Sequence, residues 1–336
     1  MLGPKLQETN MDRRSFCATA STAAAAAFFP WRVRAAAPYP GKPIRVISPY
    51  AAGGGPDLLL RQVGPALGQA LGQPIVIENK VGAGGVLAAI HAAQQPADGY
   101  LLLMGANTHL VQKAMQPELG FDPIADFAPA SNFATSPAML VVNAGSAYQK
   151  LDDLMAAAKT WPGQMNYGSG GIGTAAHLAG ATLVSLMGIE AVHVPLKGSV
   201  EISASLLRGD TQFAFPIAGT AVPQVKGGKL RALAVTSRSR LQELPELPTL
   251  HELLGGNELA IQESWFGLWA PARTPAQILA TLNAAVKKVV ATPSLRSAAQ
   301  ALGTELSASP QACAAFVRGE NLKWAELVRL AGVSGG

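Results

Sequence analysis

The chain has 336 residues, of which 49% are hydrophobic and 14% are charged, and its formal net charge is +5. Residues 1–35 hold five basic and two acidic residues, so +3 of that charge belongs to the N-terminus and only about +2 to the rest. A nearly neutral remainder lacks the basic surface that nucleic-acid binding requires, and we expect no nucleic-acid partner.

The N-terminus predicts an export signal. Arg13 and Arg14 precede an alanine-rich apolar run from Cys17 to Trp31, and small residues follow, so that cleavage is expected after Ala35 or Ala36. A basic start, a short apolar run and small residues are typical of a secretory leader, and paired arginines are typical of the twin-arginine route. A permanent membrane anchor is the weaker alternative, because the run is too short and too rich in alanine for a span of about 20 residues. We therefore expect a cleaved leader and a periplasmic protein.

Cysteine and histidine spacing predicts neither a disulfide nor a metal site. Cleavage removes Cys17 and leaves Cys313, which lies in an apolar helical pattern and is expected to be a buried, inert thiol. The histidines form no H-x-x-x-H pair and have no cysteine partners, so we expect no metal and no cofactor. The five histidines are His91, His109, His177, His193 and His251.

The first half of the mature chain alternates between strand and helix patterns. A Gly64-Pro65 pair predicts that the first helix is kinked or ends early. Alternation at this short spacing predicts a parallel sheet covered by helices. The expected elements are a strand at 44–48, a helix after the turn at 53–57, a strand at 75–78, a helix at 86–93 and a strand at 100–104.

The alternation restarts after a connection near residues 121–138. A strand at 265–270 then returns to the first lobe, so two crossings join two α/β lobes with a hinge and a cleft between them. The predicted lobes are 38–138 with 266–336, and 139–265. The elements expected in the second lobe are strands at 139–143, 165–167, 191–195, 212–215 and 230–236, and helices at 151–159, 175–187 and 202–207.

Two glycine-rich turns are candidate anion sites. Gly53, Gly54 and Gly55 lead into a helix with Pro56 in its first turn, and a second loop runs from Gly168 to Thr174 before the next helix. Glycine permits close backbone approach, and the N–H groups at a helix start attract anions. Two facing turns of this kind suit carboxylates; the alternative is that both are only tight turns.

The residues around the second loop do not fit the motifs of a dinucleotide-binding or hydrolytic enzyme. Residues 168–173 match G-x-G-x-x-G, but no acidic residue ends the next strand at 191–195, as a dinucleotide site requires. Tyr167 stands where a nucleophile elbow around Ser169 needs glycine. His177 either donates a hydrogen bond to a ligand or caps local structure. Asp57, after the first loop, complements the dipole of its helix, and its role toward an anionic ligand stays open.

Several strings then carry a family resemblance over essentially the whole mature chain. It resembles the Bug family, the tripartite tricarboxylate transporter substrate-binding proteins of the TctC type. The strings are PYAAGGGPD at 49–57, ENKVGAGG at 78–85, PADGY at 96–100, NYGS at 166–169, HLAG at 177–180, VPLKG at 194–198, GKLRALAVT at 228–236, PELPT at 245–249 and WFGL at 265–268.

The resemblance implies a two-lobed periplasmic binding protein of the α/β class, type II-like, with a hinge and an interlobe ligand cleft. It implies a monomer, not an enzyme, that closes on a small organic carboxylate and presents it to membrane transporter subunits. The alternatives are a receptor that signals to a sensor kinase and a serine hydrolase acting through Ser169. Carried over by motif, the ligand-binding residues are Gly53, Gly54, Gly55 and Asp57 in one jaw and Ser169, Gly170, Gly173, Thr174 and His177 in the other.

Four departures from the family pattern bear on ligand choice. Pro56 replaces a usual threonine and Leu196 a usual aromatic residue. The segment 201–205 reads EISAS where the family has a Pro-Ala pair and a later aspartate, and Arg273 replaces a usual glycine. Glu201 and Ser205 are expected near the second-lobe pocket, which points to an unusual ligand.

Overall fold

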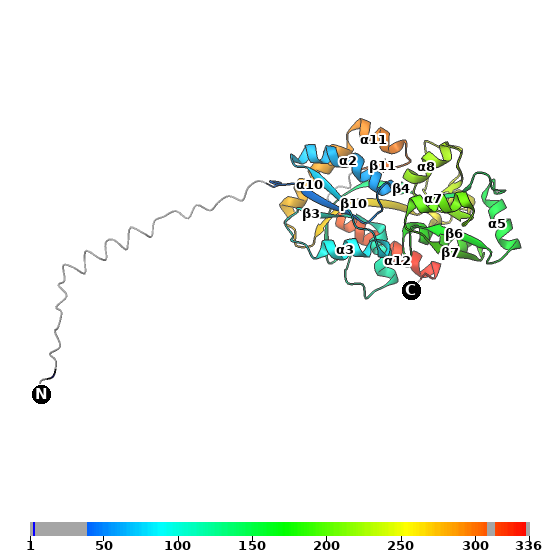
Figure 1. The fold of residues 1–336 in the computed structure, drawn as a ribbon, viewed down its shortest axis with the longest axis horizontal. Helices are drawn as coiled ribbons and strands as arrows, with labels where there is room; N and C mark the ends of the chain where they lie inside the picture. Colours follow the sequence, from blue (N-terminus) through cyan, green and yellow to red (C-terminus); the bar gives the residue numbers. More distant parts are fainter. Residues whose placement is uncertain (1–2, 4–38, 308–312, 334–336) are drawn as a thin grey trace. The chain divides into compact units, whose positions relative to one another are not determined.

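The computed structural model describes residue 3, residues 39–307 and residues 313–333, so the predicted export leader lies outside the described residues apart from Gly3. The described chain from Tyr39 onward forms two β-sheets covered by helices (Figure 1). No helix in these ranges is both long and apolar enough to cross a bilayer.

The first sheet has six strands in the order β11-β4-β10-β3-β1-β2. Strand β1 pairs in parallel with β2 and β3, whereas β10 is antiparallel to β3 and β4, and β11 is antiparallel to β4. The parallel arrangement predicted for the first three strands is therefore confirmed, and three antiparallel strands extend the sheet. The strands are β1 (Ile44–Ser48), β2 (Ile75–Asn79), β3 (Leu101–Ala106), β4 (Phe127–Pro137), β10 (Glu263–Pro271) and β11 (Glu305–Leu306).

Helices cover both faces of this sheet. One face buries Val46 and Met104 against α2 (Gly55–Leu71), α10 (Ala276–Val290) and α11 (Pro293–Gln300). The opposite face buries Leu103 and Trp269 against α3 (Val86–Ala93), α4 (Asn107–Met115) and α12 (Cys313–Ala331). Because both faces are buried, the central strands are continuously apolar instead of alternating.

The predicted early end of the first helix is wrong. Helix α2 continues through Pro65 to Leu71 and ends at Gly72, which adopts a left-handed conformation with φ of 71°. Proline removes one backbone donor, but Val63 and Leu67 on either side of it are buried in the core. We attribute the continuation to this burial, which outweighs the lost hydrogen bond.

The second sheet has five strands in the order β7-β6-β8-β5-β9. Strand β6 is parallel to β7 and β8, and β5 is antiparallel to β8 and β9. Helices α5 (Leu151–Thr160) and α6 (Ala175–Met187) pack on one face, and α7 (Ser199–Arg208) and α8 (Ala218–Lys226) on the other. The strands are β5 (Met139–Asn143), β6 (Met165–Ser169), β7 (Ala191–Pro195), β8 (Phe213–Ala214) and β9 (Leu230–Val235).

Most of the predicted connection at 121–138 is a strand, and helices α4 and α8 were not predicted. Strand β4 spans 11 residues, but its sequence contains Ser131, Asn132 and Ser136, all buried, and so lacks apolar alternation. Helix α4 follows β3 without a turn signal, and α8 contains Pro223, which masks its helical pattern. In each case tertiary burial overrides the local signal.

The chain passes between the two sheets at two points that lie side by side. Between β4 and β5 the backbone N–H of Ala138 donates to Thr236 Oγ1 over 2.9 Å, and the Thr236 hydroxyl lies 2.5 Å from the carbonyl of Gln262 at the return crossing. Helix α12 adds a third connection, because it packs against both α4 and α6. The division into lobes at residues 138 and 266 stays a prediction.

Candidate ligand-binding site

A pocket of about 530 Å³ lies where strands of both sheets end. Its walls follow the carboxyl ends of six strands, namely β1, β2 and β3 of one sheet and β6, β7 and β8 of the other. Open α/β sheets place their ligands at this end. The wall residues at or just beyond these strand ends are Pro49, Tyr50, Ala51, Gly54, Pro56, 81–86, Asn107, Thr108, 170–172, 174–176, 195–198, Pro216 and Ile217; Gln112, Gln116, Leu119, Ile202, Ser264 and Phe266 complete the wall.

Several helices begin in this wall. Val86, Asn107 and Ala175 are the first residues of α3, α4 and α6, and Pro56 lies in the first turn of α2. The N-cap residues of α2, α3 and α7 are Gly54, Gly85 and Gly198, which have no side chain with which to cap the helix. The partial positive charge of helix N-termini stabilises a bound anion.

Charged side chains are nearly absent from the pocket. Of the described residues that line it, Lys197 is the only charged one, and it is exposed. Neutral polar side chains in the wall include Asn107, Thr108 and Gln112. The remainder is mostly glycine and apolar side chains, so a ligand would meet neutral donors, helix ends and hydrocarbon.

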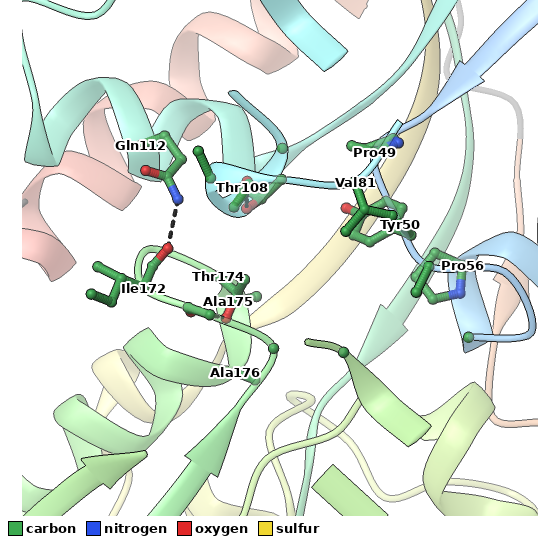
Figure 2. Close-up of a pocket in the computed structure, with 18 of the residues that line it drawn as sticks. Pro49, Tyr50, Pro56, Val81, Thr108, Gln112, Ile172, Thr174, Ala175 and Ala176 are labelled. Carbon is green, nitrogen blue, oxygen red and sulfur yellow. Dashed lines mark hydrogen bonds between the residues drawn. The ribbon is translucent and has the colours of Figure 1, made fainter. Parts of the chain in front are cut away.

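Three hydrogen bonds join the segments on the two sides of the pocket. Gln112 Nε2 on α4 donates to the carbonyl of Ile172 over 2.7 Å (Figure 2). Thr108 Oγ1 lies 3.3 Å from the carbonyl of Gly173, and the N–H of Gly55 donates to Thr220 Oγ1 over 3.1 Å. The loop before α6 is thus held against α4, and α2 against α8.

Of the four predicted residues in the first jaw, Gly54 lines the pocket and the other three lie behind it. Gly53 adopts φ of 77° and donates its N–H to Asp57 Oδ2 over 2.9 Å. Asp57 is fully buried and also accepts from Arg61 and Asn79. Burial alone would raise the pKa of Asp57, but these donors outweigh it and hold the pKa below its usual range. The carboxylate therefore anchors the turn, and its binding role stays a prediction.

In the second jaw, Gly170 and Thr174 line the pocket, while Ser169, Gly173 and His177 lie behind it. Thr174 Oγ1 caps α6 by accepting from the N–H of His177, and Nδ1 of His177 accepts from the N–H of Gly173 over 3.1 Å. His177 therefore hydrogen-bonds within its own loop, which is the local capping role, one of the two roles predicted for it. A role of these residues in ligand contact stays a prediction.

A histidine pair supports the second glycine loop from behind. The rings of His177 and His193 stack with centroids 3.8 Å apart, and Tyr167 stacks against His177. Burial lowers the pKa of each histidine to about 4, and His177 further lowers that of His193. Both rings are therefore neutral at physiological pH and act as packing and hydrogen-bonding groups.

A Ser-His contact is present, but its geometry does not suit a nucleophile. Ser169 Oγ lies 2.7 Å from His193 Nε2, a proximity that no sequence motif indicated. Ser169 is fully buried, and its hydroxyl also contacts the carbonyl and the N–H of Gly171 within its own loop. Among the described residues no carboxylate hydrogen-bonds to His193. A serine nucleophile needs exposure and an oriented base, so the pair is better explained as a loop support.

Several lining residues were missed from the sequence. Asn107 and Thr108 follow β3 directly. Ligands bind at the carboxyl ends of strands, and this argument, which led to the turns after β1 and β6, also predicts these two residues. Gln112 lies one turn into α4, where no local signal marks it. Lys197 belongs to the string VPLKG at 194–198, which carries part of the family resemblance, but it was not predicted to be a site residue.

The departures from the family pattern divide into two groups. Pro56 and Leu196 line the pocket. Glu201 accepts from the N–H of Lys197, Ser205 bonds to Thr211, and neither residue is part of the wall. Pro56 and Leu196 therefore alter the surface that a ligand meets, and so does Ile202 of the 201–205 segment, whereas Glu201 and Ser205 do not. Among the described residues no group of three potential metal ligands occurs.

The fold and the pocket define a two-lobed α/β binding protein of the periplasmic type. The periplasmic binding protein BugD superposes with a TM-score of 0.83 at 29% identity, over 88% of this chain and 99% of that one. An adipate-bound protein of R. palustris gives 0.83 at 30% identity, with coverages of 88% and 99%. MatC from Rhodopseudomonas palustris, solved with bound malate, gives 0.80 at 28%, with coverages of 86% and 100%.

Sequence relatives place the chain in a family. Residues 59–333 match the TctC model, described as the tripartite tricarboxylate transporter family receptor. Protein BugT of Bordetella pertussis is 31% identical over 297 residues, which cover 88% of this chain and 90% of BugT. This protein belongs to the TctC family, as its sequence motifs predicted.

Proposed function

We propose that this protein is an exported solute-binding protein that captures a small organic carboxylate and delivers it to the membrane subunits of a tripartite tricarboxylate-type transporter. The observation that carries the proposal is the pocket itself, at which four helices begin and in whose described wall Lys197 is the only charged residue. Helix ends and neutral donors, with no carboxylate among the described wall residues, suit an anion. The adipate and malate bound to two solved relatives are carboxylates of this kind.

Capture proceeds by closure of the two lobes around the ligand. Segments from both sheets form the wall, so an occupied pocket stabilises the arrangement in which they face each other. The bonds from Gln112 to Ile172 and from Gly55 to Thr220 join the two sides of the pocket, so separation of the lobes would break them. A transporter that recognises the closed form would then receive only loaded protein, and a single chain suffices for this mechanism.

Export precedes binding in this proposal. The paired arginines Arg13 and Arg14 and the alanine-rich run direct the precursor across the inner membrane, and cleavage after Ala35 or Ala36 releases the mature chain. The family assignment supports a periplasmic location, because the solved relative BugD is a periplasmic binding protein.

A thermal-shift screen of the purified exported protein tests the proposal. The panel contains mono-, di- and tricarboxylates, aromatic acids and acidic amino acids. Ligand at one hundred times Kd stabilises the native state by about 2.7 kcal/mol, which raises the Tm measurably. We expect at least one acid to do so without being converted, as judged by chromatography of the recovered acid.

A pair of glycine variants locates the site. Gly54→Leu places a bulky side chain at the pocket wall and should abolish the shift; the Gly54 φ of −72° is compatible with a side chain, and its Cβ would lie 3.2 Å from the carbonyl oxygen of Ala51. Gly319→Leu is the control, because Gly319 lies in α12 with no atom within 4 Å of an added Cβ. Failure of every acid to shift the Tm, or turnover of the acid that does, would refute the proposed function.

A further inference from the structure

A second cavity, of about 350 Å³, lies on the other side of β4 and β10 from the ligand pocket. We call it the rear cavity; Thr135 on β4, Glu263 on β10, helix α11, residues 303–306 and residues 239–243 line it. We propose that the rear cavity widens as the ligand pocket closes, so that a side chain filling it favours closure and tightens ligand binding. The inference rests on the proposed function, because it concerns the movement that closes the pocket.

The two walls of the rear cavity belong to different sheets. Residues 303–306 include β11, the edge strand of the first sheet, and α11 packs on that sheet. Residues 239–243 follow β9, an edge strand of the second sheet. Between the walls, Nε2 of Gln300 on α11 donates a hydrogen bond to Oε1 of Gln242. A movement of one half of the molecule relative to the other therefore changes the width of this cavity.

The strands at the two crossings separate the rear cavity from the ligand pocket. On β10, Glu263 lines the rear cavity, whereas the next residue, Ser264, lines the ligand pocket. Successive residues of a strand project to opposite faces. In the first sheet, β4 and β10 lie between β11, which lines the rear cavity, and β3, β1 and β2, at whose ends the ligand pocket lies. The two cavities are thus on opposite sides of β4 and β10.

A tight contact at the start of α8 lies between the two cavities. An added Cβ on Gly303 would lie 2.9 Å from the Cβ of Ala218, and one on Gly219 would lie 3.5 Å from Thr304 Oγ1. Ile217, directly before α8, lines the ligand pocket, whereas Gly303 and Thr304 line the rear cavity. Atoms that are already packed cannot approach further, so rotation about this contact narrows one cavity as it widens the other.

The structure combines a joined ligand pocket with a wide rear cavity. The bonds from Gln112 to Ile172 and from Gly55 to Thr220 are made while the rear cavity keeps its volume. Opening of the ligand pocket would bring the rear walls together. A bulky side chain in the rear cavity would then clash, which destabilises the open arrangement and leaves the joined one unaffected. The apparent affinity rises with the population of the arrangement that binds the ligand.

Two tryptophan variants fill the rear cavity from its two walls. Thr135→Trp does so from β4, where Thr135 and Pro137 both line the cavity, as residues two apart share one face of a strand. Ser239→Trp does so from the opposite wall, at an exposed position, and keeps the test valid if Thr135→Trp does not fold. Ser294→Trp is the matched control, because Ser294 is exposed on α11 but lines neither cavity.

Isothermal titration calorimetry of the exported protein, with the acid that gives the largest thermal shift, measures the effect. We expect Thr135→Trp and Ser239→Trp each to bind the acid about three- to tenfold tighter than wild type, because each raises the fraction of protein in the binding arrangement. Ser294→Trp should bind as wild type does. A gain in affinity is not the result of a merely damaged structure. Unchanged or weaker binding by the folded tryptophan variants would overturn the inference and leave acid capture intact.

Small-angle X-ray scattering measures the movement without relying on affinity. We expect the radius of gyration of wild type to fall when the acid is added, and that of the unliganded Ser239→Trp variant to lie closer to the ligand-bound value. Absence of binding by every acid would refute the proposed function. Scattering of the unliganded proteins would still test the rear cavity in that case, since equal radii for wild type and both tryptophan variants would overturn the inference by themselves.

Discussion

At the residue scale, the glycine loop of the second sheet depends on aromatic and imidazole rings packed behind it. Gly180 permits this packing, because a Cβ there would lie 2.4 Å from the ring of Tyr167. Tyr167 in turn stacks on His177, and His177 stacks on His193, whose Nε2 contacts Ser169. The loop that lines the pocket is therefore positioned by side chains that do not themselves line it.

Stability should depend on pH through these histidines. An unfolded histidine has a pKa near 6.5, whereas burial lowers the pKa of His177 and of His193 to about 4. Between these values the unfolded chain binds more protons, so the free energy of unfolding should fall as pH drops from about 6.5 to about 4. Above about pH 6.5 these two histidines do not change the free energy of unfolding with pH. Urea denaturation between pH 4 and 8 measures the effect.

His193→Gln tests the assignment, because it removes one titrating ring and should reduce the slope between pH 4 and 6.5. Ser169→Ala is the control, since it removes the hydroxyl that contacts His193 without removing a titrating group. Parallel pH curves for wild type and His193→Gln would count against the explanation.

At the element scale, α12 connects the two halves of the molecule. It packs against α4 of the first sheet and α6 of the second, and buries Trp324 completely. Glu320 on this helix accepts the indole N–H of Trp265 over 2.9 Å and that of Trp324 over 2.8 Å. One carboxylate thus satisfies two indole donors where α12 meets β10.

Glu320→Ala should lower the free energy of unfolding by about 2–4 kcal/mol, because it leaves two indole N–H groups without their acceptor. Glu326→Ala on the same helix is the matched control. Its carboxylate pairs with Arg329 at the surface, and we expect a change within about 0.5 kcal/mol. Urea denaturation at pH 7 measures both. Equal effects of the two variants would contradict the role given to Glu320.

At the scale of the whole molecule, the pocket is assembled from two halves that are far apart in sequence. Gln112 joins them, since its amide donates to Ile172, 60 residues further along the chain. Gly84 and Gly173 make room for it, because a Cβ at either would lie within 2.5 Å of the Gln112 amide. The contact between the two loops therefore requires small residues on both sides of the Gln112 side chain.

Gln112→Met keeps the length of the side chain but removes the donor. We expect ligand affinity to fall about two- to tenfold, because the bond contributes only in the closed arrangement. Gln95→Met is the control, since the Gln95 amide donates to His91 within its own region, away from the pocket. Calorimetry with the acid that gives the largest thermal shift measures both variants. Unchanged affinity in Gln112→Met would show that this bond does not contribute to closure.

The sequence by itself determined the strand and helix alternation, the family and the two glycine loops that enter the pocket, since these depend on local periodicity and on glycine at turns. Gly54, Gly170 and Thr174 were found in this way. Only the tertiary structure decided that polar β4 pairs within a sheet, that α2 continues through Pro65, and that Asn107 and Gln112 line the site. These features depend on burial and on contacts between distant segments, which no local pattern encodes.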